Sequence, residues 1–131
     1  MIDEIIDLYQ ESQVHKGITY DDAMRLLAPP LRLGQWYFER DADGNLSAFL
    51  TWAYLTDEAA DGYVTRTRLL QASDWDAGDQ LFFIDLIAPH GIPRGFAGRV
   101  KALFPDNHKA RFTRCYRSTG VVDRVGSISN G

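Results

Sequence analysis

The feature that most restricts the possible folds of this 131-residue chain is a hairpin signal in residues 35–55, QWYFERDADGNLSAFLTWAYL. Two apolar, aromatic runs flank the pair Asp43-Gly44, and an Asp-Gly step between such runs is typical of a tight turn joining antiparallel strands. A third strand-like run, residues 81–88, is almost wholly apolar and is followed by Pro89. Together these segments predict a sheet with mostly antiparallel pairing.

Helices and shorter strands complete the predicted layer structure. Apolar spacing predicts a helix over residues 2–12, and Thr19 with Asp22 three positions later marks the start of a second helix. Pro29 and Pro30 are expected to end that second helix. The same patterns predict four shorter elements, namely helical segments at 56–60 and 95–104 and strands at 110–116 and 121–128. We therefore expect one α/β (α+β) domain over residues 1–131, with a mixed, mostly antiparallel sheet flanked by helices.

Composition excludes several classes of protein. The single cysteine, Cys115, rules out an internal disulfide or a multi-cysteine metal site, and the three histidines are scattered. The acidic N-terminus lacks a signal-peptide pattern, and no apolar run nears the roughly 20 residues that span a bilayer. The aromatic residues of 35–55 alternate with strand period, which favours a core role over nucleic-acid stacking. These features predict a soluble, cytoplasmic protein with no bound metal, no nucleic-acid partner and no membrane span.

Charge is unevenly distributed along the chain. Residues 94–131 contain eight basic and two acidic side chains, whereas residues 1–93 contain six basic and sixteen acidic ones. A basic third on an acidic protein indicates either an anionic partner or a solvated basic face. Arg94 and Arg99 stand near the start of the predicted helix 95–104, and a helix N-terminus with basic side chains can bind phosphate. The glycines there do not match a P-loop, and most such turns bind nothing.

Asp85 is the most unusual residue, because it stands in the middle of the apolar run 81–88. A buried carboxylate without a partner costs several kcal/mol, so Asp85 needs a backbone amide, an arginine or a histidine as donor. His15 lies in the short connection between the two N-terminal helices, and an imidazole can act as a general base near neutral pH. His90, directly after the strand, is a further candidate. From the residues alone, structural roles are favoured over catalytic ones.

Four stretches of this sequence resemble the lysine acyltransferases that activate RTX toxins. They are SQVHK (12–16), WAYL (52–55), DWDAGDQLFFIDLIAPHG (74–91) and LFPD (103–106), in the family's order and at near-family spacing. The resemblance implies a GNAT-like fold. It also implies thioester aminolysis, in which a fatty acyl group passes from acyl carrier protein to an internal lysine of an RTX-type protoxin. No tightly bound cofactor is expected, because the phosphopantetheine thioester is the donor substrate.

The resemblance also implies roles for individual residues. The essential histidine of the family falls on His15, its catalytic aspartate on Asp85, and the serine of its Ser-x-x-His motif on Ser12. His15 would act either as the general base, with Asp85 fixing its tautomer, or as a nucleophile that forms an acyl-imidazole. The basic side chains expected to receive the phosphopantetheine phosphate and the acidic carrier protein are Arg94, Arg99 and Lys101.

Two departures from the family pattern leave alternatives open. Leu26 stands where some members carry a functional asparagine, and members usually extend further at the C-terminus, where part of the toxin- or dimer-contacting surface would lie. A homodimer is expected from the family's habit. The alternatives are a GNAT-type acetyltransferase that uses acetyl-CoA, for which RGFAGR is a loose loop match, and a non-catalytic binding module of the same fold.

Overall fold

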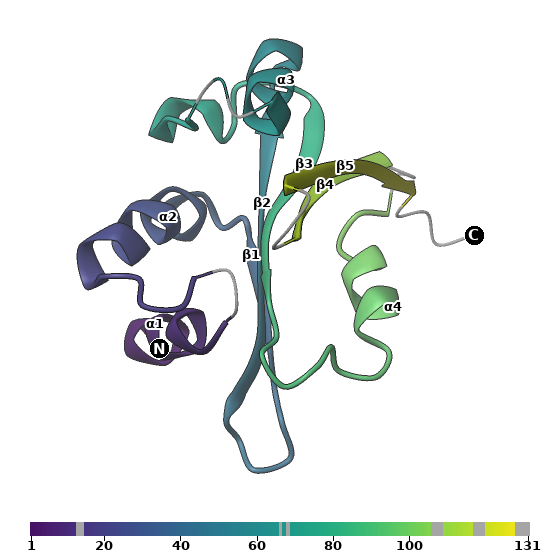
Figure 1. Cartoon of the computed structure of the whole chain (residues 1–131). Coiled ribbons are helices and arrows are strands. Elements are labelled where there is room, and N and C mark those ends of the chain that lie inside the picture. The colour runs from purple at the N-terminus through teal and green to yellow at the C-terminus, as the bar shows by residue number, and fades with distance from the viewer. Residues whose placement is uncertain (13–14, 66, 68, 106–108, 117–119, 128–131) are drawn as a thin grey trace. The chain divides into compact units, whose positions relative to one another are not determined.

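The computed structural model describes the whole chain except residues 13–14, 66, 68, 106–108, 117–119 and 128–131, and it describes 113–116 and 120–127 as backbone alone. The elements in chain order are α1 (Ile2–Glu11), α2 (Tyr20–Leu33), β1 (Trp36–Arg40), β2 (Leu46–Leu55), α3 (Asp57–Thr65), the 3-10 turn η1 (Ala72–Asp74), β3 (Gln80–Ile87), α4 (Phe96–Lys101), β4 (Lys109–Tyr116) and β5 (Gly120–Ser127). The strands are hydrogen-bonded in the order β1-β2-β3-β4-β5 (Figure 1). The predicted α/β class, with a mixed sheet and helices, is confirmed.

The chain forms two compact units, and strands β2 and β3 each contribute to both. The first unit contains Met1–Thr51 and Asp85–Phe96, and the second contains Trp52–Ile84 and Ala97–Gly131. The segment predicted as a last strand, 121–128, is β5, although Ile128 lies outside the described residues.

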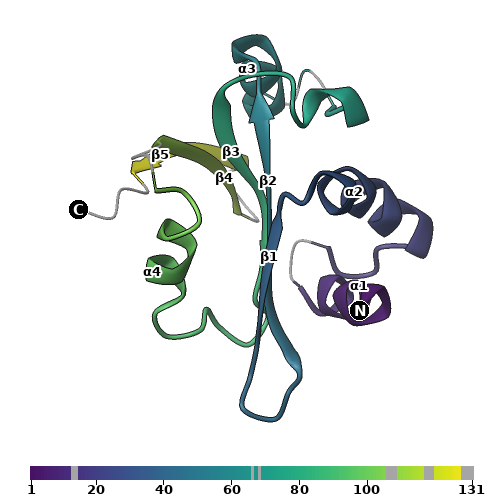
Figure 2. The same cartoon turned by 180° about the vertical axis from the view of Figure 1, so that it is seen from behind.

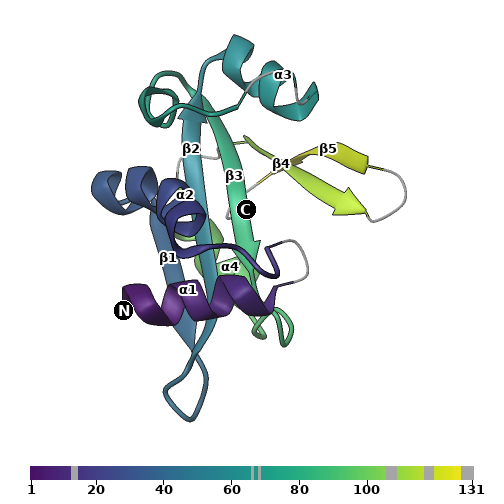
Figure 3. The same cartoon turned by 60° about the vertical axis from the view of Figure 1, so that its left-hand side comes forward.

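In the first unit, α1 and α2 pack against one side of the β1–β2 hairpin (Figures 1 and 2). Figure 3 shows α1 lying across the direction of these strands. The residues buried in this core are Ile5, Ile6, Leu8, Tyr9, Ala23, Leu27, Leu46, Phe49 and Ile87. Each large apolar side chain buried here stabilises the fold by about 1.5–3 kcal/mol relative to exposure. The apolar spacing of α1 therefore reflects its role as a cover for the hairpin.

Helix α2 corrects one prediction from the sequence. Its start agrees, because the Thr19 hydroxyl accepts a hydrogen bond from the Asp22 amide at 3.2 Å. Its end does not, because Pro29 and Pro30 lie inside the helix, which ends at Leu33 and is capped by Gly34 in the left-handed conformation. Both proline rings are buried. Burial of two apolar rings offsets part of the cost of the backbone hydrogen bonds that proline cannot donate.

The hairpin forms as predicted, around the Asp43-Gly44 turn. Strands β1 and β2 are antiparallel, with Trp36 opposite Thr51, and the turn is closed by the Asp41 carboxylate, which accepts from the backbone amides of Asp43 and Asn45. Gly44 has a φ of +84°, which a residue with a side chain rarely adopts.

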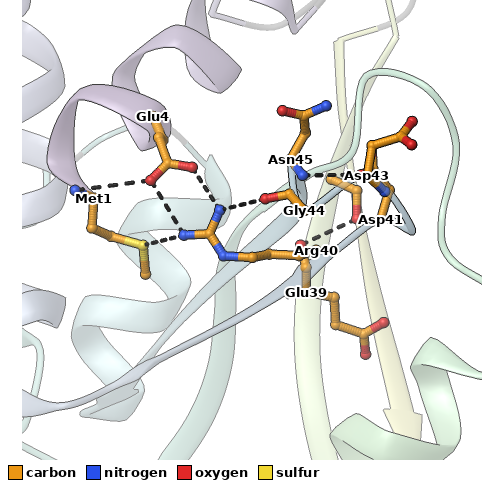
Figure 4. A network of polar contacts seen from close by, with 9 residues as sticks. Met1, Glu4, Glu39, Arg40, Asp41, Asp43, Gly44 and Asn45 are labelled. Atoms are coloured by element: carbon orange, nitrogen blue, oxygen red, sulfur yellow. Dashed lines mark hydrogen bonds and ion pairs between the residues drawn. The ribbon is translucent and has the colours of Figure 1, made fainter.

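Arg40, the last residue of β1, ties this hairpin to the first turn of α1 (Figure 4). Its guanidinium donates to both carboxylate oxygens of Glu4, at 2.6 and 3.2 Å, and to the carbonyl of Gly44 at 2.9 Å. The sulfur of Met1 lies 3.6 Å from the same guanidinium. Because Arg40 donates to it, the pKa of the Glu4 carboxyl is held below its ordinary value of 4.5.

In the second unit, two kinds of strand pairing meet. Strand β3 pairs in parallel with β4 from Leu81 to Phe83, and β4 pairs antiparallel with β5 along its whole length. The sheet is therefore mixed, as the fold prediction required. Edge-to-face contacts of Phe104 with Trp52 and Phe83, at 5.0 and 6.0 Å between ring centroids, hold the segment after α4.

Helix α4 is shorter than predicted. The expected range was 95–104, but Gly95 has a φ of +78° and the regular helix ends at Lys101. Beyond it, the amide of Phe104 bonds to the carbonyl of Lys101, which is a tighter turn than the α-helix. Phe104 is buried although it lies beyond the helix, so its place in the apolar pattern wrongly extended the predicted helix to residue 104.

The Glu4–Arg40 pair generates a pH prediction. A carboxylate with a lowered folded pKa stabilises the fold above its unfolded pKa, and that contribution is lost as the pH falls through the folded value. Glu4→Gln should therefore reduce the free energy of unfolding at about pH 7, and the difference from wild type should vanish as the pH falls well below 4.5. Chemical denaturation at several pH values measures this. Asp3→Asn, which removes a charge from the same helical turn, is the matched control, because the bonds from Arg40 are made to Glu4.

Gly78 generates a packing prediction. A Cβ at this position would lie 2.2 Å from the carbonyl oxygen of Leu55 and 2.5 Å from the amide nitrogen of Thr56. Gly78→Ala should therefore reduce the free energy of unfolding by about 1–3 kcal/mol, measured by urea denaturation. Gly98→Ala is the control, because nothing lies within 4 Å of the place its methyl group would take and alanine favours a helix. Equal stabilities of the two variants would contradict the close approach at Gly78.

Candidate active site

Two side chains distant in sequence meet in the first unit, His15 in the turn after α1 and Asp85 in β3. The imidazole Nε2 of His15 lies 2.9 Å from the carboxylate Oδ1 of Asp85. The side chains are only 16% and 12% exposed, respectively. This contact answers the question of which donor serves the carboxylate, since histidine was one of the three donors considered.

Local backbone structure determines where the imidazole lies. Ser12 follows the last residue of α1, and its amide donates to the carbonyl of Tyr9 at 3.1 Å. The Ser12 hydroxyl then accepts from the amide of His15 at 2.9 Å, and the amide of Ile18 donates to the carbonyl of His15. Gly17, with a φ of +81°, allows the chain to turn here. Ser12 therefore supports the turn that carries His15, while residues 13–14 of the same motif lie outside the described residues.

Tyr9 is a contact residue of this pair that sequence reasoning missed. Its hydroxyl donates to the second carboxylate oxygen of Asp85, Oδ2, at 3.0 Å. Its ring stacks on the imidazole of His15, with centroids 5.1 Å apart and planes 26° from parallel. The only available signal was that a buried tyrosine hydroxyl usually finds a polar partner. Because Tyr9 fits the apolar stripe of α1, its hydroxyl was overlooked.

The geometry restricts what each nitrogen of the imidazole can do. Because Nε2 faces the Asp85 carboxylate, which can only accept when ionised, the Nε2–H group donates the hydrogen bond. In the neutral imidazole, Nδ1 is then the nitrogen with a lone pair. A carboxylate that accepts from an imidazole favours one tautomer and stabilises an imidazolium when it forms. The arrangement can therefore serve as a general base or a nucleophile at Nδ1.

The other histidine considered, His90, has a different partner. Its Nε2 lies 3.0 Å from Glu11 Oε2, and both side chains are largely exposed. His90 thus joins the end of α1 to the segment after β3 and does not contact Asp85 in the described structure. Leu26, where some family members carry asparagine, packs against the apolar core of α1, α2 and the hairpin.

The predicted donor-binding residues fall into both units. Arg94 lies in the segment after β3 in the first unit, and Arg99 and Lys101 lie in α4. The two arginines are exposed and the lysine is half-buried. Part of the basic third has a structural role, because Arg111 of β4 contacts Asp61 at 3.5 Å and Gln80 at 3.3 Å and lies over the Phe82 ring. The phosphate-binding helix start expected here is reduced to a helix of six residues.

A groove of about 690 Å³ also lies in the first unit. Its lining comes from α1, the hairpin turn and the segment after β3, namely Glu4, Asp7, Leu8, Glu11, Arg40, Asp41, Asn45, Leu46, Ser47, His90, Gly91, Ile92 and Pro93. The lining described for it includes neither His15 nor Asp85, so the groove and the His15–Asp85 pair are separate features.

Two kinds of feature are absent from the part of the chain that the structure describes. No group of three or more histidine, cysteine, aspartate or glutamate side chains in this part is placed to hold a metal ion. None of the helices described is both long and apolar enough to cross a membrane.

Comparison with known proteins shows which family this chain belongs to. A model of the RTX toxin acyltransferase family matches residues 1–128. The chain belongs to this family. Asp85 and His15 stood out from the residues themselves, and resemblance to the family added Ser12 and suggested a role for each. The chain brings all three together in one unit.

Individual members support the same assignment. The lysine-acyltransferase RtxC of Vibrio cholerae serotype O1 is 29% identical over 94 residues, which cover 72% of this chain and 61% of that protein. The RTX-II toxin-activating lysine-acyltransferase ApxIIC of Actinobacillus pleuropneumoniae is 34% identical over 131 residues, which cover 100% of this chain and 81% of that protein. The protein-lysine myristoyltransferase HlyC of Escherichia coli is 30% identical over 99 residues, which cover 76% of this chain and 56% of that protein. The chain thus spans between about half and four-fifths of these relatives.

Proposed function

We propose that this chain is a protein-lysine acyltransferase that moves a fatty acyl group from acyl carrier protein to an internal lysine of an RTX-type protoxin. The observation that carries the proposal is the contact between His15 and Asp85 in a chain of the RTX toxin acyltransferase family. The relatives are named for lysine acylation and toxin activation. With acyl carrier protein as the donor, we expect the reaction to take place in the cytoplasm.

The chemical difficulty of the reaction explains why an imidazole is needed. A free lysine amine has a pKa of about 10.4, so well under about 0.1% is neutral at pH 7. In the proposed mechanism, His15 Nδ1 accepts a proton from the lysine as its nitrogen attacks the thioester carbonyl. Asp85 stabilises the imidazolium through Nε2. The C–N bond forms, the C–S bond breaks, and the imidazolium returns its proton to the leaving thiolate.

The same geometry also accommodates a covalent route. In it, Nδ1 of His15 attacks the thioester carbonyl, the C–S bond breaks and the thiolate leaves. The lysine amine then attacks the acyl-imidazole, the C–Nδ1 bond breaks, and the proton lost by the amine balances the one that the thiolate takes up. Rapid-quench mass analysis separates the routes, because only the covalent route accumulates an acylated enzyme that discharges when the acceptor is added. The general-base route leaves the enzyme mass unchanged under single-turnover conditions.

The basic residues of α4 support a docking role for the donor. Acyl carrier proteins are acidic, and complementary charge accelerates and orients association. Arg99 is exposed and Lys101 is half-buried on the same short helix, while Arg94 lies in the first unit. We assign these three residues to the carrier protein and its phosphopantetheine phosphate. A homodimer belongs to the same proposal, and its test is the mass of the protein in solution.

Substitution of the pair tests the function directly. With loaded acyl carrier protein and a protoxin acceptor, His15→Gln should lower kcat by about 10²–10⁴, and Asp85→Asn should lower it with the imidazole still present. Intact-mass analysis of the acceptor measures the transfer. His90→Gln is the control, because it removes another imidazole that contacts a carboxylate in the same unit. Full activity of His15→Gln would remove the catalytic assignment. Transfer from acetyl-CoA but not from the loaded carrier would indicate a GNAT-type acetyltransferase, and no transfer from either would indicate a binding module.

Charge reversal of Arg99 and Lys101 tests the donor surface. Because a charge pair at the protein surface contributes up to about 1 kcal/mol, the double variant to glutamate should raise the donor KM by roughly tenfold and weaken its salt dependence. Arg25→Glu, a reversal of an exposed arginine on α2, is the matched control. A donor KM that matches the control would show that the carrier protein docks elsewhere.

A further inference from the structure

We propose that Tyr9 is a positioning residue for the acyl transfer, and that it acts through Asp85 and the imidazole of His15. Its hydroxyl donates to Asp85 Oδ2, which keeps Oδ1 bonded to Nε2 of His15. The other nitrogen of His15, Nδ1, is then left to accept the lysine proton or to attack the thioester. The inference rests on the proposed function, because the geometry that Tyr9 maintains matters only if His15 performs chemistry.

The first argument concerns the freedom of the carboxylate. The terminal torsion of an aspartate side chain is broad, so a carboxylate held at one oxygen can rotate away from its partner. Asp85 is held at both oxygens, by Tyr9 at 3.0 Å and by His15 at 2.9 Å. Asp85 is 12% exposed and Tyr9 is fully buried, so water competes little for either bond. One buried partner and one largely buried partner thus restrict the carboxylate to one orientation.

The second argument is that the contacts form a closed circuit. The Tyr9 carbonyl accepts from the Ser12 amide, and the Ser12 hydroxyl accepts from the His15 amide. The His15 ring bonds to Asp85, and Asp85 accepts from the Tyr9 hydroxyl. Tyr9 therefore enters the circuit twice, through its backbone and its side chain. A displacement of any one of the four residues must stretch a bond to the next.

The third argument concerns the plane of the imidazole. The Tyr9 ring stacks on the His15 ring, which restricts its tilt. The Tyr9 ring is itself held by an edge contact with Phe49 of β2, 6.2 Å between centroids. Reacting groups must be placed within fractions of an ångström for efficient transfer, so a fixed ring plane has kinetic value.

These contacts distinguish positioning from direct catalysis and from donor or acceptor binding. The Tyr9 hydroxyl donates its hydrogen to Asp85 Oδ2, so it does not donate to the thioester while this bond is made. Removal of the hydroxyl should therefore lower kcat and leave both KM values within about twofold, because the oriented imidazole contributes in the transition state and not to the binding of either substrate.

The test compares Tyr9→Phe with Tyr37→Phe. Both changes delete one hydroxyl that donates to a carboxylate in the first unit, since Tyr37 donates to Glu39 at 2.6 Å. We expect Tyr9→Phe to lower kcat by about tenfold, which corresponds to about 1.4 kcal/mol of transition-state stabilisation, and Tyr37→Phe to leave it unchanged. Replacement of Tyr9 by 4-aminophenylalanine keeps a donor at the same ring position and should recover most of the loss.

A second measurement does not depend on activity. In ¹⁵N-histidine-labelled protein, the Nε2–H of His15 should give a slowly exchanging proton signal, because it donates to the Asp85 carboxylate in a largely buried contact. The signal is assigned with His15→Gln. Tyr9→Phe should broaden it or accelerate its exchange with water, because Asp85 is then free to rotate, and Tyr37→Phe should leave it as in wild type.

Each outcome decides the proposal. An unchanged Nε2–H signal and kcat in Tyr9→Phe would overturn it. A Tyr9→Phe protein that lacks the native near-ultraviolet circular dichroism would also overturn it, because Tyr9 would then hold the fold and not the imidazole. Failure of wild-type protein to transfer any acyl group, with the Nε2–H signal still dependent on Tyr9, would defeat the proposed function and leave the positioning contact established.

Discussion

In the first unit, the arrangement of α1, the turn after it and β3 depends on one interaction: the Asp85 carboxylate must have hydrogen-bond donors. Asp85 lies in an apolar strand, where a charge without donors would cost several kcal/mol. Both of its oxygens have donors from the N-terminal segment, one from a tyrosine in α1 and one from a histidine just beyond it. The same interaction satisfies the buried charge and orients an imidazole, so structural stability and chemistry have a common physical cause.

Helix α1 is held near both ends by polar contacts. Near its start, Glu4 bonds to Arg40 at the end of β1. Near its end, Tyr9 and the turn after the helix bond to Asp85, and Glu11 bonds to His90 beyond β3. Between these points, its apolar face packs on the hairpin. A helix held in this way delivers His15 to a defined position, which a surface turn alone would not do.

Family membership and the geometry of the His15–Asp85 pair are two independent observations on the same function. The match over residues 1–128 places the chain among the RTX toxin acyltransferases, and the relatives' names indicate lysine acylation. The geometry shows which nitrogen of His15 contacts Asp85, and the proposed function assigns the other nitrogen to the substrate. The proposed use of acyl carrier protein as the acyl donor is supported mainly by the positive charge of Arg99 and Lys101 on α4. Part of the basic third is already engaged, since Arg111 contacts Asp61 and Gln80.

Much of this protein was determined by the sequence alone, because short-range signals decide it. The Asp43-Gly44 turn, the Thr19 cap and the apolar strand around Asp85 depend on neighbours a few residues away, and each was predicted correctly. The continuation of α2 through Pro29 and Pro30 was decided by tertiary structure, because burial of the two rings offsets part of the cost of proline inside a helix. The bond from the Tyr9 hydroxyl to Asp85 spans 76 positions and was likewise decided only by packing. A tyrosine in an apolar stripe carries no local sign of what its hydroxyl will meet, since that partner is supplied by the folding of a distant strand.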